Sequence, residues 1–234
     1  MERKELQLQP RLQLLADLVP QGARLADIGT DHGYLPVWLL QRGRISFAIA
    51  ADVGYEPLQH AVRTAQEQEV SGVEFHLCDG LRGITADEVD TVVIAGMGGE
   101  TIIHILEAAE WTKMPGAYTL LLQPMTKAAE LRRWLTDNGY YFTAERLVFD
   151  KDFIYPVMIV TGGEQPELTE LQVRYGVDLD RDPLYGDYLQ REIARLTKQI
   201  EGQRRAGDPE KRAQAEELAK LCAALEEKRK ECVK

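Results

Sequence analysis

The chain has 234 residues, of which 44% are hydrophobic and 28% are charged, and its formal net charge is −10. This length and composition fit one globular α/β domain with a smaller appendage. No stretch approaches the roughly 20 apolar residues of a membrane-spanning helix, and the charged start lacks the apolar core of a signal peptide, so we expect a cytoplasmic protein without a membrane partner.

Short apolar runs alternate with amphipathic stretches in the first part of the chain. An amphipathic helix is expected at 6–19, ended by Pro20, before a strand at 24–28 and a helix at 34–42. The same patterns then predict strands at 46–51, 73–77, 91–95 and 118–122, and helices at 56–69, 101–109 and 127–138. Five strand–helix units in succession predict an α/β fold with a parallel sheet and helices on both faces.

Two further strands, at 142–149 and 154–161, follow without a helix between them. Adjacent strands joined by a short polar link are antiparallel. An antiparallel closing pair is typical of the class I methyltransferase variant of the Rossmann-like sheet, whereas the sixth strand of a dinucleotide dehydrogenase is parallel.

A helical hairpin is expected after a linker at 162–166. Two stretches at 183–205 and 209–230 carry apolar residues at three- and four-residue steps, and a Gly-Asp-Pro sequence at 207–209 separates them. The spacing predicts two antiparallel helices with a coiled-coil-like seam. The predicted domains are residues 1–164 and 165–234.

Charge is distributed unevenly between these two parts. Residues 1–166 hold 14 Lys+Arg and 23 Asp+Glu, a net of −9, whereas residues 167–234 hold 14 and 15, a net of −1. A polyanion is therefore expected to bind the C-terminal part. The candidate phosphate contacts are Arg191, Arg195, Lys198, Arg204 and Arg205. A solvated helix face with mixed charge accounts for the same pattern without a partner.

The segment after the first predicted strand is polar and rich in glycine. In open parallel sheets, ligands bind beyond the carboxyl ends of the strands. Asp27 lies at this strand end, and Asp31 and His32 stand between Gly29 and Gly33, which let the backbone turn tightly. A carboxylate on the strand can bind the positively charged ammonium group of a ligand, whereas it is a poor partner for a pyrophosphate. A tight turn without a ligand is the alternative, but buried acids and imidazoles are costly without partners.

Two more acids follow the next strands. Asp52, after the second strand, can accept hydrogen bonds from both ribose hydroxyls, and Asp79, followed by Gly80, can accept from an adenine amino group. Each acid taken alone has a simpler explanation. An acid occurs at a strand end by chance, and Asp79-Gly80 can form an Asp-Gly turn. Together with Asp27, in this order, they predict S-adenosylmethionine, which carries an ammonium, a sulfonium and an adenosine.

Glycines and polar groups also follow the fourth and fifth strands. Three glycines within 96–99 let the backbone approach the reactive methyl group and the incoming base, or simply form a flexible link. Gly80 and Gly96 are added to the expected cofactor contacts. The expected substrate contacts near the sheet are Tyr34, Met97 and Pro124, and the candidate catalytic residues are Asp31, His32 and Gln123. Arg11 would meet the cofactor carboxylate if the first helix covered the site, although a surface position is the simpler expectation.

Taken together, these segments resemble the bacterial tRNA (adenine-N1)-methyltransferases that act on adenine 22. The matching segments are 26–36, 79–81, 94–99, 122–124 and 131–135. The resemblance implies a methyltransferase domain followed by a helical coiled coil. It also implies that S-adenosylmethionine is held by Asp27, Gly29, Asp31, Gly33, Asp52 and Asp79. The sequence departs from the family at Glu56, where glycine is usual, and at Met125, where asparagine is common.

The implied reaction transfers the methyl group to adenine N1, whose lone pair needs no prior deprotonation. The protein would position a base turned out of its stack, and Asp31 would help to remove the N6 proton. Two other classes fit the residues: a methyltransferase of small molecules or proteins, with the hairpin serving dimerisation, and a non-catalytic RNA-binding scaffold. The three cysteines show no metal-binding spacing, so we expect no metal, and a monomer or weak dimer.

Overall fold

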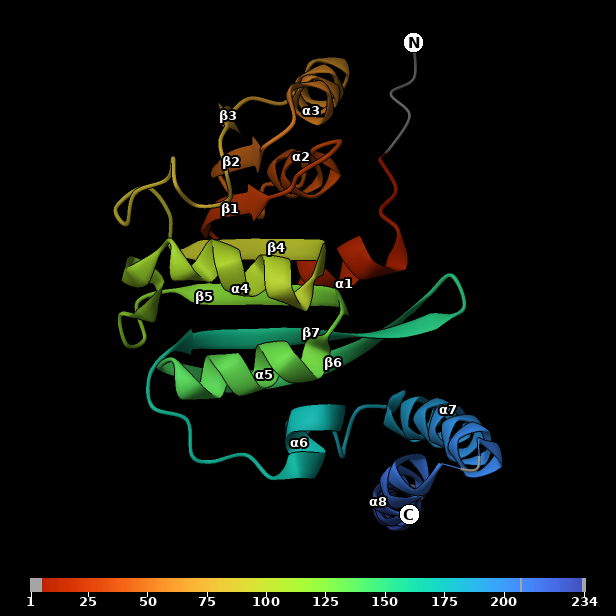
Figure 1. The fold of residues 1–234 in the computed structure, drawn as a ribbon. Helices are drawn as coiled ribbons and strands as arrows, with labels where there is room; N and C mark the ends of the chain where they lie inside the picture. The colour runs from red at the N-terminus through yellow and green to blue at the C-terminus, as the bar shows by residue number, and fades with distance from the viewer. Residues whose placement is uncertain (1–5, 207, 233–234) are drawn as a thin grey trace. The chain divides into compact units, whose positions relative to one another are not determined.

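The computed structural model describes residues 6–206 and 208–232 (Figure 1). The chain forms two compact units that divide after Val177. The charged start at residues 1–5 and the expected helix stop at Gly207 lie outside the described residues. Among the residues that are described, no helix is both long and apolar enough to cross a membrane.

A seven-stranded sheet organises the first unit, with the spatial order β3-β2-β1-β4-β5-β7-β6. The strands are β1 (Arg24–Ile28), β2 (Phe47–Asp52), β3 (Val73–Leu77), β4 (Thr91–Gly98), β5 (Thr119–Thr126), β6 (Tyr140–Asp150) and β7 (Phe153–Gly162). The first five pair in parallel, and β7 is antiparallel to both β5 and β6. The Rossmann-like sheet and its antiparallel closing pair are confirmed.

Helices cover both faces of this sheet (Figure 1). They are α1 (Pro10–Leu18), α2 (Tyr34–Gln41), α3 (Tyr55–Glu67), α4 (Gly99–Glu107), α5 (Ala128–Asp137) and the short α6 (Glu170–Tyr175), with a 3-10 turn at Glu110–Lys113. Successive side chains of a strand point to opposite faces. Ala26 and Ile28 therefore join the core beneath α4 and α5, and Leu25 joins the core beneath α1 and α2. Burial on both faces explains the continuous apolar runs in the sequence.

The structure differs from the predicted elements in two places near the sheet edge. The connection from β3 to β4 forms turns, and no helix was predicted there either, so the expected number of five strand–helix units is wrong and four build the sheet. In addition, β4 and β5 continue to Gly98 and Thr126, beyond the apolar runs. The two strands pair with each other over this extension, with an irregular register around Met97. Pairing between strands supplies hydrogen bonds that local sequence does not reveal.

The glycine at the start of α4 is required by packing within the protein. A Cβ built on Gly99 would lie closer than 3.0 Å to the carbonyl oxygen of Lys127. A backbone oxygen at the end of a paired strand cannot move aside as a side chain can. The close approach at this glycine is therefore to the protein's own backbone and not to a ligand.

We expect Gly99→Ala to lower the free energy of unfolding by about 1–3 kcal/mol, as overpacking does. Urea denaturation of the full chain measures the change. Gly98→Ala is the matched control, because its Cβ would lie 3.2 Å from the hydroxyl of Thr126, a side-chain atom that can rotate away. Equal losses for the two variants would contradict this explanation.

The second unit is a helical hairpin formed by α7 (Tyr185–Arg205) and α8 (Pro209–Cys232). The buried positions of both helices recur at helical spacing. They are Leu189, Ile193, Leu196 and Ile200 in α7, and Ala215, Cys222 and Leu225 in α8. The predicted pair of helices is confirmed, and a coiled-coil supercoil stays a prediction.

The first unit ends at Val177, later than the expected border at residue 164. Arg132 of α5 and Glu145 of β6 form an ion pair with no solvent exposure. The Nη1 of Arg132 donates to the carbonyl oxygens of Val173 (3.1 Å) and Arg174 (3.3 Å), and the N–H of Val177 donates to Glu145 (2.8 Å). These bonds tie the segment after α6 to the sheet, so it belongs to the first unit.

Candidate functional site

A cavity of about 540 Å³ opens at the carboxyl ends of β1 and β4. The strand order reverses between these two strands, and open α/β sheets bind ligands at this point. A volume of this size is typical of small-molecule sites. The lining comes from the segment after β1, the end of β4, the start of α1 and the β6–β7 turn: Gln9, Arg11, Leu12, Asp27, Gly29, Thr30, Asp31, His32, Tyr34, Leu35, Ala95, Gly96 and Lys151.

Asp27 places a carboxyl group in the wall of this cavity. The residue is only 7% exposed, and its Oδ2 accepts a hydrogen bond from the hydroxyl of Thr30 (2.7 Å). Burial is the main cause that raises the pKa of Asp27 to about 6; the hydrogen bond from Thr30 opposes this rise and the nearby charge of Asp52 adds to it. The ionised form is therefore costly in the free protein, and a cationic ligand group would offset that cost.

The loop after β1 turns through several left-handed residues. The φ angles of Gly29, Asp31 and Gly33 are 75°, 42° and 66°. The expectation that Asp31 and His32 are buried is wrong, because this turn carries their side chains outward, with 69% and 40% exposure. Both still line the cavity, as does the partly exposed Tyr34.

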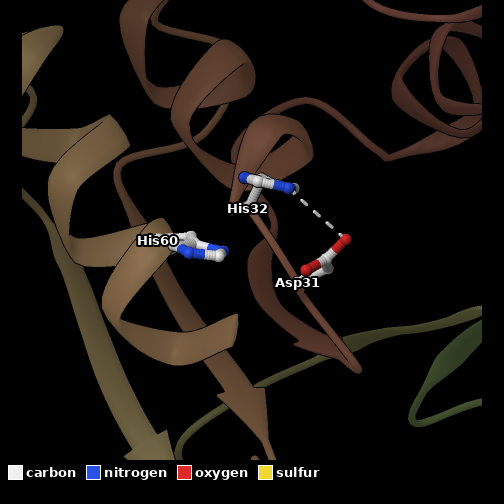
Figure 2. Close-up of side chains that lie close together, drawn as sticks. All are labelled: Asp31, His32 and His60. Atoms are coloured by element: carbon white, nitrogen blue, oxygen red, sulfur yellow. Dashed lines mark ion pairs between the residues drawn. The ribbon is translucent and has the colours of Figure 1, made fainter. Parts of the chain in front are cut away.

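Three aromatic rings form one stack beside this loop. His32 lies between Tyr34, at a centroid distance of 5.0 Å, and His60 of α3, at 4.8 Å, with interplanar angles of 6° and 10°. Figure 2 shows the two imidazole rings edge-on and parallel, with Asp31 beside His32. The sequence patterns did not single out His60, because it joins the group only through the packing of α3. A stack of this kind offers its outer face to another planar ring.

The same group contains potential metal ligands. The ligand atoms of Asp31, His32 and His60 all lie within 4.8 Å of one another. Stacked imidazoles hold their nitrogen lone pairs in parallel planes, so both rings would have to rotate out of the stack to share one cation. The observed arrangement favours stacking over metal binding.

The three predicted acids stand at three successive strand ends, since β3, β2 and β1 are neighbours. Only Asp27 lines the cavity. Asp52 is half-buried and its Oδ1 accepts from the N–H of Gly54 (2.7 Å). Asp79 is exposed, 3.5 Å from the guanidinium of Arg82. The structure thus arranges the acids in the expected order along the edge, with Asp27 buried, Asp52 half-buried and Asp79 exposed.

Three other predicted contacts are not among the residues that line the cavity. Gly80 is buried, and a Cβ there would lie 2.8 Å from Ile105. Met97 fills the space beside Gly29, where a Cβ would collide with its methyl group. Pro124 is buried within β5. Met97 and Pro124 are withdrawn from the cavity because β4 and β5 extend further than their apolar runs predict.

Arg11, which lines the cavity, and the buried Gln123 belong to one polar network. The Nε of Arg11 donates to Asp150 (2.7 Å), its Nη1 donates to Gln123 (3.1 Å), and its guanidinium lies over the ring of Tyr155. Gln123 is fully buried and also accepts from the N–H of Gly96 (3.2 Å). Gln123 therefore holds the backbone of the cavity wall and does not face the cavity itself.

Local patterns could not reveal this network. The partners of Arg11 lie 112 and 139 positions away in the chain. Local sequence therefore favoured a surface position for Arg11, and this expectation is wrong. Met125 belongs to the same group, since its sulfur accepts from Arg11 (3.4 Å). The residue that replaces the common asparagine thus does not line the cavity itself but contacts Arg11, which does.

The predicted phosphate contacts Arg191, Arg195 and Lys198 are exposed on α7. Arg195 pairs with Glu192 of the same helix (2.7 Å). An exposed pair of this kind is weak and can exchange for a phosphate.

Comparison with known proteins places the chain among methyltransferases of tRNA. Residues 8–158 match the methyltransferase-domain family. The chain is 36% identical over 192 residues to the tRNA (adenine(22)-N(1))-methyltransferase of Bacillus subtilis (strain 168), covering 80% of this chain and 77% of that protein. It also resembles the solved B. subtilis M1A22 tRNA methyltransferase, with 30% identity, a TM-score of 0.84 and coverage of 96% and 99%.

Two other solved relatives contain the cofactor or its product. A Streptococcus pneumoniae protein in complex with S-adenosyl-L-methionine is 32% identical, with a TM-score of 0.79 and coverage of 93% of this chain and 97% of that one. M. capricolum TrmK in complex with S-adenosyl-homocysteine is 25% identical, with a TM-score of 0.79 and coverage of 96% and 99%.

Proposed function

The chain belongs to the tRNA (adenine(22)-N1)-methyltransferase family, and from this membership we propose how its residues divide the work of the reaction. The protein is an S-adenosylmethionine-dependent enzyme that methylates N1 of an adenine in tRNA. The observation that supports the location of the site is the buried Asp27 carboxyl group in a cavity where the strand order reverses.

The cavity fits the cofactor by the chemistry of its donors. S-adenosylmethionine, when bound, supplies a methyl group on a sulfonium. We propose that Asp27 accepts hydrogen bonds from the ammonium group, since among the described residues its carboxyl group accepts a side-chain hydrogen bond from the Thr30 hydroxyl alone. Asp52 and Asp79, at the next strand ends, would accept from the ribose hydroxyls and the adenine amino group. Gly29, Asp31, Gly33 and Gly96 would form the surrounding backbone.

The residues beside the cavity suit a planar substrate base. Adenine N1 attacks through its own lone pair, so this chain has to orient the base and exclude water rather than activate it. We propose that Tyr34 and His32, stacked with His60, hold the base after it leaves its own stack. Asp31, exposed beside His32, would accept the N6 proton that the methylated base releases.

We further propose that α7 holds tRNA phosphates through Arg191, Arg195 and Lys198. Their combined replacement by glutamate is expected to raise the dissociation constant for tRNA at least tenfold. The slope of log affinity against log salt should fall by about 2.7, because each of the three lost phosphate contacts removes about 0.9 from it. Filter binding over a range of salt concentrations measures both quantities.

The matched control carries the same change in net charge on the other helix. Lys211, Lys220 and Lys230 are exposed on α8, and their replacement by glutamate should weaken binding less than the α7 variant. An equal loss would mean that tRNA binding is not localised to α7.

Methyl transfer to transcribed tRNA tests the function as a whole. Mass spectrometry after nuclease digestion should find one N1-methyladenosine, absent when adenine 22 is replaced by guanine. Transfer to proteins or small molecules alone would favour the first rival class, and no detectable calorimetric binding of S-adenosyl-homocysteine would favour the scaffold. The cytoplasmic location and the monomeric or weakly dimeric state stay predictions.

A further inference from the structure

The hairpin between β6 and β7 ends in a strained turn beside the cavity. In Figure 1 this hairpin reaches beyond the end of β5. Its two turn residues, Lys151 and Asp152, have φ angles of 47° and 73°, a left-handed conformation that favours glycine or asparagine. Lys151 nevertheless occupies this position, and it lines the cavity. The turn thus presents a cation at the edge of the site.

A buried ion pair fixes this turn to the cavity wall. Asp150, the last residue of β6, is 5% exposed and pairs with Arg11 at 2.7 Å. Arg11 also lies over the ring of Tyr155 in β7 and donates to Gln123 in β5. Breaking such a pair would leave a buried charge without compensation. The tip of the hairpin is therefore held firmly against the sheet.

The same tip carries an exposed phenylalanine. Phe153 is 62% exposed, and its ring centroid lies 6.0 Å from that of Tyr155. Phe153 stands directly opposite Asp150 in the register of the two strands. The side chains of opposite residues in an antiparallel pair project to the same face. The side chain of Phe153 therefore lies on the face of the hairpin where Asp150 pairs with Arg11. A rigid aromatic ring and a cation thus stand together at one edge of the cavity.

We propose that this hairpin tip is a finger that contacts the tRNA strand next to the target adenine. Phe153 stacks on the bases that flank the vacated position, and Lys151 pairs with a neighbouring phosphate. An adenine that is turned out leaves its neighbours without a stacking partner, and aromatic rings stack on any base. The proposal rests on the proposed function, because it takes tRNA as the substrate of this cavity.

The test uses full-length protein and tRNA carrying 2-aminopurine at position 22, whose fluorescence rises when the base leaves its stack. Wild-type protein should raise the fluorescence, and Phe153→Ala should not. Single-turnover methyl transfer to unlabelled tRNA should fall about tenfold in Phe153→Ala, the effect expected for one lost stacking partner. Phe153→Trp should restore transfer. Lys151→Gln should weaken tRNA binding and reduce its salt dependence.

Tyr141→Ala is the matched control, since Tyr141 is an exposed aromatic residue of β6, the other strand of the same hairpin, and lies far from the turn in sequence. It should transfer at the wild-type rate, and the Phe153 and Tyr141 variants should bind S-adenosyl-homocysteine as the wild type does. Wild-type transfer and fluorescence in Phe153→Ala would overturn the finger alone. Absence of any transfer to tRNA by the wild-type protein would instead overturn the proposed function.

Discussion

Asp27→Asn is expected to abolish most cofactor binding and, at the same time, to stabilise the free protein. An ionised carboxylate that binds an ammonium group contributes a charge-assisted hydrogen bond. Its loss should weaken binding of S-adenosyl-homocysteine about 10- to 100-fold. Methyl transfer at low cofactor concentration should fall by the same factor. Calorimetry and initial rates measure the two effects.

The gain in stability follows from the raised pKa of Asp27. Between the ordinary pKa of 3.8 and about 6, the folded protein holds a proton that the unfolded chain releases. The free energy of unfolding of the wild type therefore falls as the pH rises through this window. Above pH 6 the full loss of stability from ionising Asp27 is present. Asparagine does not ionise, so the variant should be more stable by about 1–3 kcal/mol at pH 7.5 and little changed at pH 4.

Urea denaturation at both pH values, without ligand, checks this sign. Asp17→Asn, which changes an exposed carboxylate of α1, serves as the control and should alter neither stability nor cofactor binding. A variant that is less stable than the wild type at pH 7.5, or that binds S-adenosyl-homocysteine normally, would contradict the role given to Asp27.

Arg132→Met is expected to lower the free energy of unfolding by about 3–5 kcal/mol, because it leaves the carboxylate of Glu145 buried without its partner. It also removes the donor to the carbonyl oxygens of Val173 and Arg174. The segment after α6 should therefore become sensitive to proteases. Urea denaturation and limited proteolysis measure these effects.

Two further variants separate the buried charge from the rest of the side chain. Arg133→Ala removes an exposed pair with Glu170, which should contribute no more than about 1 kcal/mol. Arg132→Met combined with Glu145→Gln should recover much of the stability, because glutamine is neutral and still accepts from the N–H of Val177. A double variant as unstable as Arg132→Met alone would exclude the unpaired charge as the cause.

Several features of the site follow directly from the order of residues in the chain. Asp27, Asp52 and Asp79 each lie at or just after the end of a strand, and parallel strands bring their carboxyl ends to one edge. The sequence therefore predicts their order along that edge. It does not predict exposure, because burial depends on neighbouring elements. Asp27 is covered, whereas Asp79 is left open to solvent.

Other residues acquire their roles only through contacts between distant segments. Gln123 is fully buried and holds Arg11 and the backbone N–H of Gly96, two groups that line the cavity. His60 joins the aromatic stack because α3 packs beside the loop after β1, where a Cβ on Gly33 would press on Ala61. No periodicity or short motif carries this information.

The sequence alone determined the alternation of strands and helices, the antiparallel closing pair and the C-terminal helical hairpin. These features depend on apolar spacing and on glycine and proline at segment ends, which act over a few residues. Tertiary structure alone decided that Arg11 is held by Asp150 and that Lys151 lines the cavity. A buried charge is stable only beside a partner, and the fold, not the local sequence, brings that partner within reach.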